Sequence, residues 1–152
     1  MTRDLIIFDI DGTLADISAR KHLLDESPVP WDHFFALSYA DAPIQPMCDL
    51  FRMYRELRPG NCVVGCLTAR PARWQNITQQ WLRREGCDPD MLFMRADDDH
   101  RPSPVVKAER ADALIKAGWT IKLAFDDHDE IITMWRERGI TALHVGNSTE
   151  ED

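Results

Sequence analysis

Two aspartates separated by a single residue, Asp9 and Asp11, have the residue types and spacing best suited to chemistry in this sequence. They lie in the stretch Asp9-Ile-Asp-Gly-Thr-Leu14. Two acids at this spacing can hold a divalent cation, or divide a reaction between a nucleophile and a proton carrier. Gly12 lets the backbone turn sharply, and Thr13 can cap the segment that follows. Alone, the stretch favours chemistry only modestly, by about two to one, over a strand that ends in a solvated Asp-Gly turn.

Three further polar signals are expected at the same place in the fold, the carboxyl end of a strand or the turn that follows it. They are Thr68, Lys107 and the pair Asp126-Asp127. Each has an ordinary explanation on its own, since a threonine or aspartate often caps a helix and a lysine is usually solvated. Their joint occurrence in this order favours a site for a phosphoryl group and Mg²⁺, in which one carboxylate attacks phosphorus. Lys107 and the metal would offset charge on the phosphoryl oxygens, while Thr68 and backbone N–H groups hold the phosphate in line.

The elements that would position these residues are short apolar strands alternating with amphipathic helices. Strands are expected at residues 5–8, 61–67, 91–94, 120–125 and 141–145, and helices at 47–57, 71–85, 104–117 and 129–138. Pro71 suits the start of the second helix, and Gly86 suits its end. Strands that alternate with helices predict an α/β fold, a parallel sheet with right-handed crossovers that is covered on both faces. Because the carboxyl ends of its strands lie along one edge, the polar signals should meet there.

The stretch from residue 15 to residue 46 is irregular and contains four prolines, Pro28, Pro30, Pro43 and Pro46. A short helix is expected from Trp31 in its middle. The stretch is much longer than the usual loop between a strand and a helix, and loops of this length often have a functional role. We therefore expect a single domain over residues 1–152 with a small cap-like insertion at 15–46.

Composition limits the kinds of partner. Hydrophobic residues make up 44% of the 152 residues, which is typical of one globular domain. The formal net charge of −8 opposes tight nonspecific binding along a nucleic-acid backbone. It does not oppose a small phosphorylated ligand held by a few arginines and a metal.

No apolar run approaches the ~20 residues of a membrane span, and the first strand follows Met1 too closely for a signal peptide. The sequence thus predicts a cytoplasmic protein without a membrane partner. The four cysteines, Cys48, Cys62, Cys66 and Cys87, lack metal-ligand spacing and are expected to be reduced thiols in the core. Oligomeric state is not predicted.

The polar signals resemble motifs one to four of the haloacid dehalogenase (HAD) superfamily, all present in order. The resemblance rests on Asp9-Ile-Asp-Gly-Thr-Leu14, Thr68, Lys107 and Asp126-Asp127. It implies a Rossmann-like fold, with Asp9 as the nucleophile that forms an aspartyl-phosphate and Asp11 as general acid and then base. It also implies Mg²⁺ on the Asp9 carboxylate, the Asp11 backbone carbonyl and Asp126, with Asp127 nearby.

A closer resemblance, over nearly the whole chain, is to the 3′-phosphatase domain of phage-type polynucleotide kinase-phosphatases. The shared features are Phe8-Asp-Ile-Asp-Gly-Thr-Leu-Ala15, Arg20, Pro46, Thr68-Ala-Arg70, Met94-Arg95, Arg101, Val105-Val-Lys107, Leu123-Ala-Phe-Asp-Asp127 and Met134-Trp-Arg136. By this resemblance Arg20 and Arg70 contact the substrate phosphate or a neighbouring nucleotide, and Arg95 and Arg101 do likewise. We include Thr13 with these substrate-binding candidates. Arginine suits bidentate contacts to phosphate.

Two features depart from that family. Acids precede the motif-three lysine there, whereas this chain has Ser103-Pro104, for which Asp97-Asp-Asp99 is a candidate replacement. No Gly-x-x-x-x-Gly-Lys-Ser/Thr loop occurs, so a phosphatase without a kinase is expected. The leading hypothesis is a phosphomonoesterase that acts on polynucleotide 3′-phosphate ends.

The alternatives are a small-nucleotide monophosphatase, a phosphorylated signalling receiver and a catalytically silent interaction module. Receivers also use Asp, Thr and Lys on a parallel sheet, but in a different order along the chain. The intact set of four motifs argues against a silent module. The acidity of the chain favours small nucleotides or single ends over long duplexes.

Overall fold

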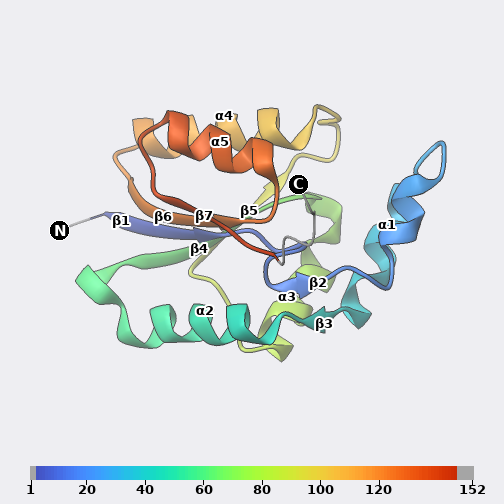
Figure 1. Ribbon diagram of the computed structural model, residues 1–152, viewed down its shortest axis with the longest axis horizontal. Coiled ribbons are helices and arrows are strands. Elements are labelled where there is room, and N and C mark those ends of the chain that lie inside the picture. The colour runs from blue at the N-terminus through green and yellow to red at the C-terminus, as the bar shows by residue number, and fades with distance from the viewer. Residues whose placement is uncertain (1–2, 147–152) are drawn as a thin grey trace, which may run out of the picture.

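A five-stranded parallel sheet forms the centre of the computed structural model, which describes residues 3–146 (Figure 1). Its strands are β1 (Asp4–Phe8), β4 (Val63–Pro71), β5 (Met91–Arg95), β6 (Thr120–Asp126) and β7 (Ala142–His144). They lie in the order β5-β4-β1-β6-β7, and all neighbours pair in parallel. The first strand is therefore central, and the expected Rossmann-like α/β fold is confirmed.

Two pairs of helices cover the two faces of the sheet (Figure 1). Helices α2 (Gln45–Leu57) and α3 (Gln75–Arg84) lie on one face, and α4 (Ser103–Lys116) and α5 (Asp129–Glu137) lie on the other. Side chains of β1 alternate between the two resulting cores. Ile6 and Phe8 pack with α2 and α3, and Leu5 and Ile7 pack with α4 and α5. A strand that is apolar on both sides is what burial between two helical layers requires.

Strand β4 is longer than expected. It runs to Pro71, so Thr68 and Arg70 belong to the strand instead of following it. The expectation that Pro71 begins a helix is wrong: the turn η4 (Ala72–Trp74) follows, and α3 begins at Gln75. Proline is tolerated here because Pro71 is the last residue of β4 and lies beyond an irregularity in its pairing with β5.

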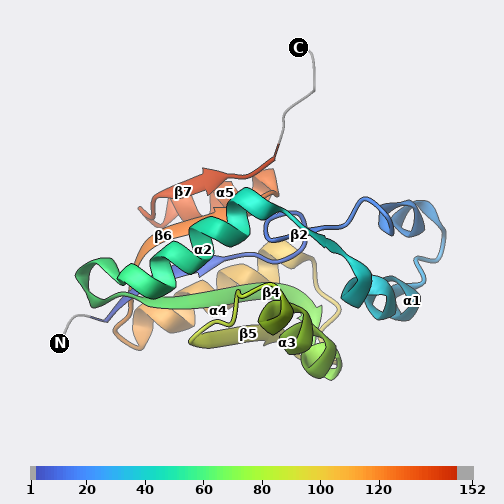
Figure 2. The same ribbon diagram turned by 90° about the horizontal axis from the view of Figure 1, so that it is seen from below.

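The 15–46 segment leaves the sheet after β1, and its last two residues, 45 and 46, already belong to α2. It contains β2 (Ala15–Asp16), η1 (Lys21–Asp25), α1 (Trp31–Ala36), η2 (Leu37–Ala40) and β3 (Ala42–Pro43). Strands β2 and β3 pair antiparallel, and the rest extends beyond the carboxyl end of β1 (Figure 2). A small separate core of Leu23, Phe34 and Phe35 holds the segment together. The short helix expected from Trp31 is confirmed.

All four cysteines are free and buried, as expected. Among residues 3–146, no helix has both the length and the apolarity needed to cross a membrane.

Candidate active site

A tight turn after β1 fixes the first carboxylate. The backbone N–H of Asp9 still donates to the carbonyl of Phe125 on β6, at 2.9 Å. One residue later the carbonyl of Ile10 accepts the N–H groups of Thr13 at 3.1 Å and of Leu14 at 2.9 Å, which closes the turn. The hydroxyl of Thr13 donates to Asp9 Oδ2 at 3.1 Å. Thr13 therefore orients the Asp9 carboxylate at the end of the central strand.

Lys107 joins the first and last acidic motifs. Its Nζ donates to Asp9 Oδ1 at 2.8 Å and to Asp126 Oδ2 at 2.7 Å. The lysine lies on α4 and is only 2% exposed, so both ion pairs are shielded from water. Asp126 is further fixed by the backbone N–H of His128, which donates to its Oδ1 at 3.0 Å. Residues about a hundred positions apart are thus brought into one cluster at the carboxyl edge of the sheet.

Three carboxylates of this cluster suit a divalent cation. Asp9, Asp126 and Asp127 each offer an oxygen, and these oxygens all lie within 4.8 Å of one another. With Lys107 counted, three negative charges face one positive charge. Burial raises the pKa of Asp9 well above its usual value, and the neighbouring Asp126 raises it further. A buried group of oxygen ligands with an excess of two negative charges fits Mg²⁺, and a bound cation would reverse this shift.

The absence of a side chain at Gly12 lets the carboxylate of Asp127 lie close to the backbone of the turn. Its backbone has φ +81°, and a Cβ at this position would lie 1.9 Å from Asp127 Oδ2. We expect Gly12→Ala to displace Asp127 and to weaken Mg²⁺ binding about 10–100-fold, the usual effect of disturbing the support of a metal ligand. Titration calorimetry with Mg²⁺ measures this. Gly139→Ala is the control, since φ is +72° there but no atom lies within 4 Å of the added Cβ. Equal Mg²⁺ affinity in the two variants would contradict the prediction.

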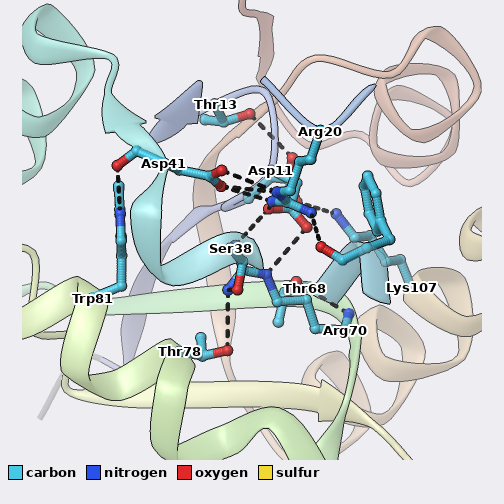
Figure 3. A network of polar contacts seen from close by, with 12 residues as sticks. Asp11, Thr13, Arg20, Ser38, Asp41, Thr68, Arg70, Thr78, Trp81 and Lys107 are labelled. Carbon is cyan, nitrogen blue, oxygen red and sulfur yellow. Dashed lines mark hydrogen bonds and ion pairs between the residues drawn. The ribbon is translucent and has the colours of Figure 1, made fainter. Parts of the chain in front are cut away.

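The carboxylate of Asp11 is not part of this cluster and lies between two arginines (Figure 3). Arg20 Nη2 donates to Asp11 Oδ1 at 2.6 Å, and Arg70 donates to both oxygens, at 2.5 and 3.1 Å. Burial alone would raise the pKa of Asp11, but Arg70 and then Arg20 outweigh it and lower the pKa to about 2. The Asp11 side chain is therefore bound by arginines and does not belong to the acidic cluster of Asp9, Asp126 and Asp127.

Four residues that the sequence did not single out hold these arginines in place. They are Ser38, Asp41, Thr78 and Trp81 (Figure 3). Asp41 accepts Arg20 Nε at 3.0 Å and Nη2 at 2.7 Å, and its own backbone carbonyl accepts Trp81 Nε1 at 2.9 Å. Arg70 Nη1 donates to the hydroxyls of Thr78 at 3.1 Å and Ser38 at 3.4 Å. Both guanidinium groups are 1% exposed, so the 15–46 segment and α3 together fix two positive charges beside Asp11.

Thr68 belongs to β4, the strand that pairs with β1. It is buried on β4, and its hydroxyl accepts the backbone N–H of Arg70 at 3.2 Å. A cavity of about 230 Å³ lined by Thr68 also has Arg95 and Arg101 in its wall.

Arg95 and Arg101 hydrogen-bond outside the acidic cluster. Arg95 donates to the carbonyls of Ala69 at 2.9 Å and Asp99 at 3.0 Å, and so braces the loop before α4. Arg101 pairs with Asp99 at 2.8 Å and with Glu109 at 2.6 Å. Their contact with substrate stays a prediction.

Two of the three acids proposed to replace the missing family acids, Asp97 and Asp99, are engaged elsewhere. Asp97 accepts the backbone N–H of Arg73 at 2.8 Å, and Asp99 is paired with Arg101. In the part of the chain that the structure describes, neither belongs to the acidic cluster of Asp9.

Comparison with known proteins identifies relatives along almost the whole chain. Residues 3–149 match the family described as the polynucleotide kinase PNKP phosphatase domain. Acid phosphatase 1 of Solanum lycopersicum is 28% identical over 131 residues, which are 78% of this chain and 48% of that protein. This chain therefore spans about half the length of the curated relative.

Solved structures share the fold. A chain of the Pnkp1/Rnl/Hen1 complex superposes with a TM-score of 0.80 at 23% identity, over 95% of this chain and 46% of the other. The class C acid phosphatase of Bacillus anthracis with bound tungstate has a TM-score of 0.67 at 13% identity, over 99% of this chain and 69% of the other. At these identities the structures indicate a common architecture.

Proposed function

The chain belongs to the family of polynucleotide kinase PNKP phosphatase domains, and from this we propose that it removes phosphate from polynucleotide 3′ ends as a Mg²⁺-dependent phosphomonoesterase. The observation that carries the proposal is the buried contact of Lys107 with Asp9 and Asp126, beside two arginines that converge on Asp11. A nucleophilic carboxylate, an acidic cluster and fixed positive charge are the parts that phosphoryl transfer requires. A similar fold in the Pnkp1/Rnl/Hen1 RNA repair complex is consistent with nucleic-acid ends as substrate.

The reaction would proceed in two displacements at phosphorus. An oxygen of Asp9 bonds to phosphorus while the bond from phosphorus to the 3′ oxygen breaks, and that oxygen takes a proton from Asp11. Asp11 can carry this proton only after substrate phosphate has displaced its carboxylate from Arg20 and Arg70, because these arginines lower its pKa to about 2. Water then attacks the aspartyl-phosphate and transfers its proton to Asp11, which frees Asp9 and inorganic phosphate. Phosphate oxygens would compete with Asp11 for Arg20 and Arg70, because these guanidinium groups match either anion.

Asp9, Asp126 and Asp127 would hold the metal, together with the backbone carbonyl of Asp11. When bound, Mg²⁺ supplies positive charge that offsets the charge of the phosphoryl oxygens. Lys107 would keep the Asp9 carboxylate oriented, and Thr68 would bind a phosphoryl oxygen through its hydroxyl.

We further propose that the 15–46 segment acts as a small cap within one phosphatase domain over residues 1–152. It contributes Arg20 directly to the site, and it contributes Ser38 and Asp41 as supports of the two arginines. Its own small aromatic core lets it keep its shape beyond the carboxyl end of the sheet.

A small-nucleotide monophosphatase is the second candidate. The net charge of −8 favours it, because a negatively charged protein repels a long polynucleotide more strongly than it repels a mononucleotide. Both candidates use the same chemistry at Asp9.

Phosphate release from matched substrates separates the two candidates. We expect a 3′-phosphorylated oligonucleotide to be hydrolysed with a higher kcat/KM than the 3′ and 5′ mononucleotides. EDTA should abolish the reaction, and added Mg²⁺ should restore it. A preference for mononucleotides would favour the second candidate, and equal inertness on every substrate in the presence of Mg²⁺ would reject both.

A further inference from the structure

An aromatic surface lies next to the two arginines of the site. Trp31 and Tyr39 are 51% and 42% exposed, and both belong to the 15–46 segment. The ring of Trp31 is stacked on Phe35, with centroids 6.0 Å apart and planes inclined by 20°. Phe35 is buried, so Trp31 is supported from below while much of its other surface faces solvent. Exposed, rigidly backed rings of this kind are suited to stacking against a flat ligand.

Arginines of η4 and α3 lie opposite the aromatic segment. Residues 61–84 contain four arginines and no aspartate or glutamate, although the next residue, Glu85, pairs with Arg84 at 2.9 Å. Arg73 and Arg84 come from this stretch and contact the aromatic segment directly. The Cζ of Arg84 lies 4.6 Å from the centre of the Tyr39 ring, and Arg73 pairs with Asp32 of α1 at 2.7 Å. The Arg73–Asp32 pair is exposed, and such pairs contribute little, so a phosphate can replace the carboxylate at low cost.

Packing contacts through the buried Phe34 connect Trp31 to Arg20 of the active site. The guanidinium of Arg20 lies 4.3 Å from the centre of the Phe34 ring, and the centre of Phe34 is 5.9 Å from that of Trp31. Arg70 reaches the same segment through Ser38, at 3.4 Å. A ligand whose phosphate meets Arg20 and Arg70 therefore has Trp31 a single ring away.

We propose that the seam between α1 and η2 on one side and η4 and α3 on the other binds the unpaired nucleotides that precede the 3′-phosphate. Bases stack on Trp31 and Tyr39, and backbone phosphates lie near Arg73 and Arg84. This inference rests on the proposed function and adds how the end is recognised. An unpaired strand fits because it offers free base faces, whereas a base inside a duplex is already stacked on both sides.

Dependence on substrate length tests the seam. The substrates are 3′-phosphorylated strands of one, two, three and five nucleotides, in the deoxyribonucleotide or ribonucleotide series that is hydrolysed. We expect KM to fall about tenfold, equivalent to ~1.4 kcal/mol, between one and three nucleotides. Trp31→Ala should remove this fall while kcat and the KM of the mononucleotide stay within about twofold of wild type. Trp31→Phe should keep most of it, because the stacking ring remains.

Leu57→Ala is the matched control, since Leu57 is a 73% exposed apolar residue on α2, outside the seam. It should show the length dependence of the wild type. A wild-type KM that does not change with length, or a Trp31→Ala protein that keeps the full dependence, would overturn the seam.

A binding measurement keeps this result separate from the proposed activity. The probe is a fluorescently labelled three-nucleotide strand that ends in a 3′-hydroxyl, which no phosphatase can hydrolyse. Fluorescence anisotropy should show about tenfold weaker binding to Trp31→Ala than to wild type, and weaker binding of the same strand in a duplex. Equal binding by the two proteins would overturn the seam even if 3′-phosphates are hydrolysed. Binding as expected without hydrolysis would uphold the seam and reject the proposed reaction.

Discussion

Replacing Asp9 with asparagine should lower kcat for phosphate release by at least about 10⁴-fold. The carboxylate that would attack phosphorus is held on both oxygens, by Thr13 and by Lys107, and is thereby fixed at the end of the central strand. An amide of the same shape accepts the Thr13 hydrogen bond but is not a nucleophile at neutral pH. Steady-state phosphate release with Mg²⁺ measures the loss of activity. After incubation with ³²P-labelled substrate, a denaturing gel of the variant should show no labelled phosphoenzyme.

The stability of the same variant separates chemistry from misfolding. Burial raises the pKa of Asp9 well above its usual value, which means that its charged form is costly in the metal-free protein. Asp9→Asn removes that charge and one of three clustered carboxylates. We therefore expect the variant to unfold at a higher temperature than wild type in EDTA, although it is inactive. Retained activity would exclude Asp9 as the nucleophile, and a lower unfolding temperature would show that the amide disturbs the turn.

The apolar pattern of the sequence predicts correctly which residues lie at or near the ends of strands. Asp9, Thr68 and Asp126 follow apolar stretches whose burial on both faces identifies them as central strands of a parallel sheet. Once the sheet is parallel, its topology alone brings those ends to one edge. Even so, β4 continues through Arg70 to Pro71, because pairing with β5 resumes after an irregularity that no periodicity in the sequence indicates.

The residues that hold the two arginines in place could not be predicted from the sequence. Asp41 is one of 26 acidic residues, and nothing local marks it as the partner of Arg20, 21 positions earlier. The same holds for Trp81, which reads as an ordinary core tryptophan and is one, but also donates to the backbone of Asp41. Such partners are set by how the 15–46 segment folds back onto α3. A general rule still applies: a buried arginine requires an acid, and its identity comes from the fold.

Lys107→Met should have the largest effect on the stability of the metal-free protein. Lys107 is the one cation bonded to Asp9 and Asp126 among the described residues, and methionine fills a similar volume without charge. Removing one partner of a buried ion pair leaves uncompensated charge, which costs about 3–5 kcal/mol. Urea unfolding at pH 7 in EDTA measures the free energy of unfolding. Lys116→Met is the control, because Lys116 is on the same helix but exposed.

The free energy of unfolding of the Lys107→Met protein should depend on both pH and Mg²⁺. An acid whose pKa is higher in the folded than in the unfolded protein binds more protons when folded, so the free energy of unfolding falls as pH rises above its usual pKa of about 4. Asp9 is such an acid, and replacing Lys107 removes the ammonium group that lowers its pKa. The Lys107→Met protein should therefore regain stability between pH 7 and pH 5, and Mg²⁺ at pH 7 should stabilise it by mass action. Its kcat should still fall about 10²–10³-fold, because the metal replaces charge in the cluster but not the ammonium that faces the nucleophile. Stability that is unchanged by the substitution, at either pH, would mean that the acidic cluster is neutralised by protons and not by Lys107.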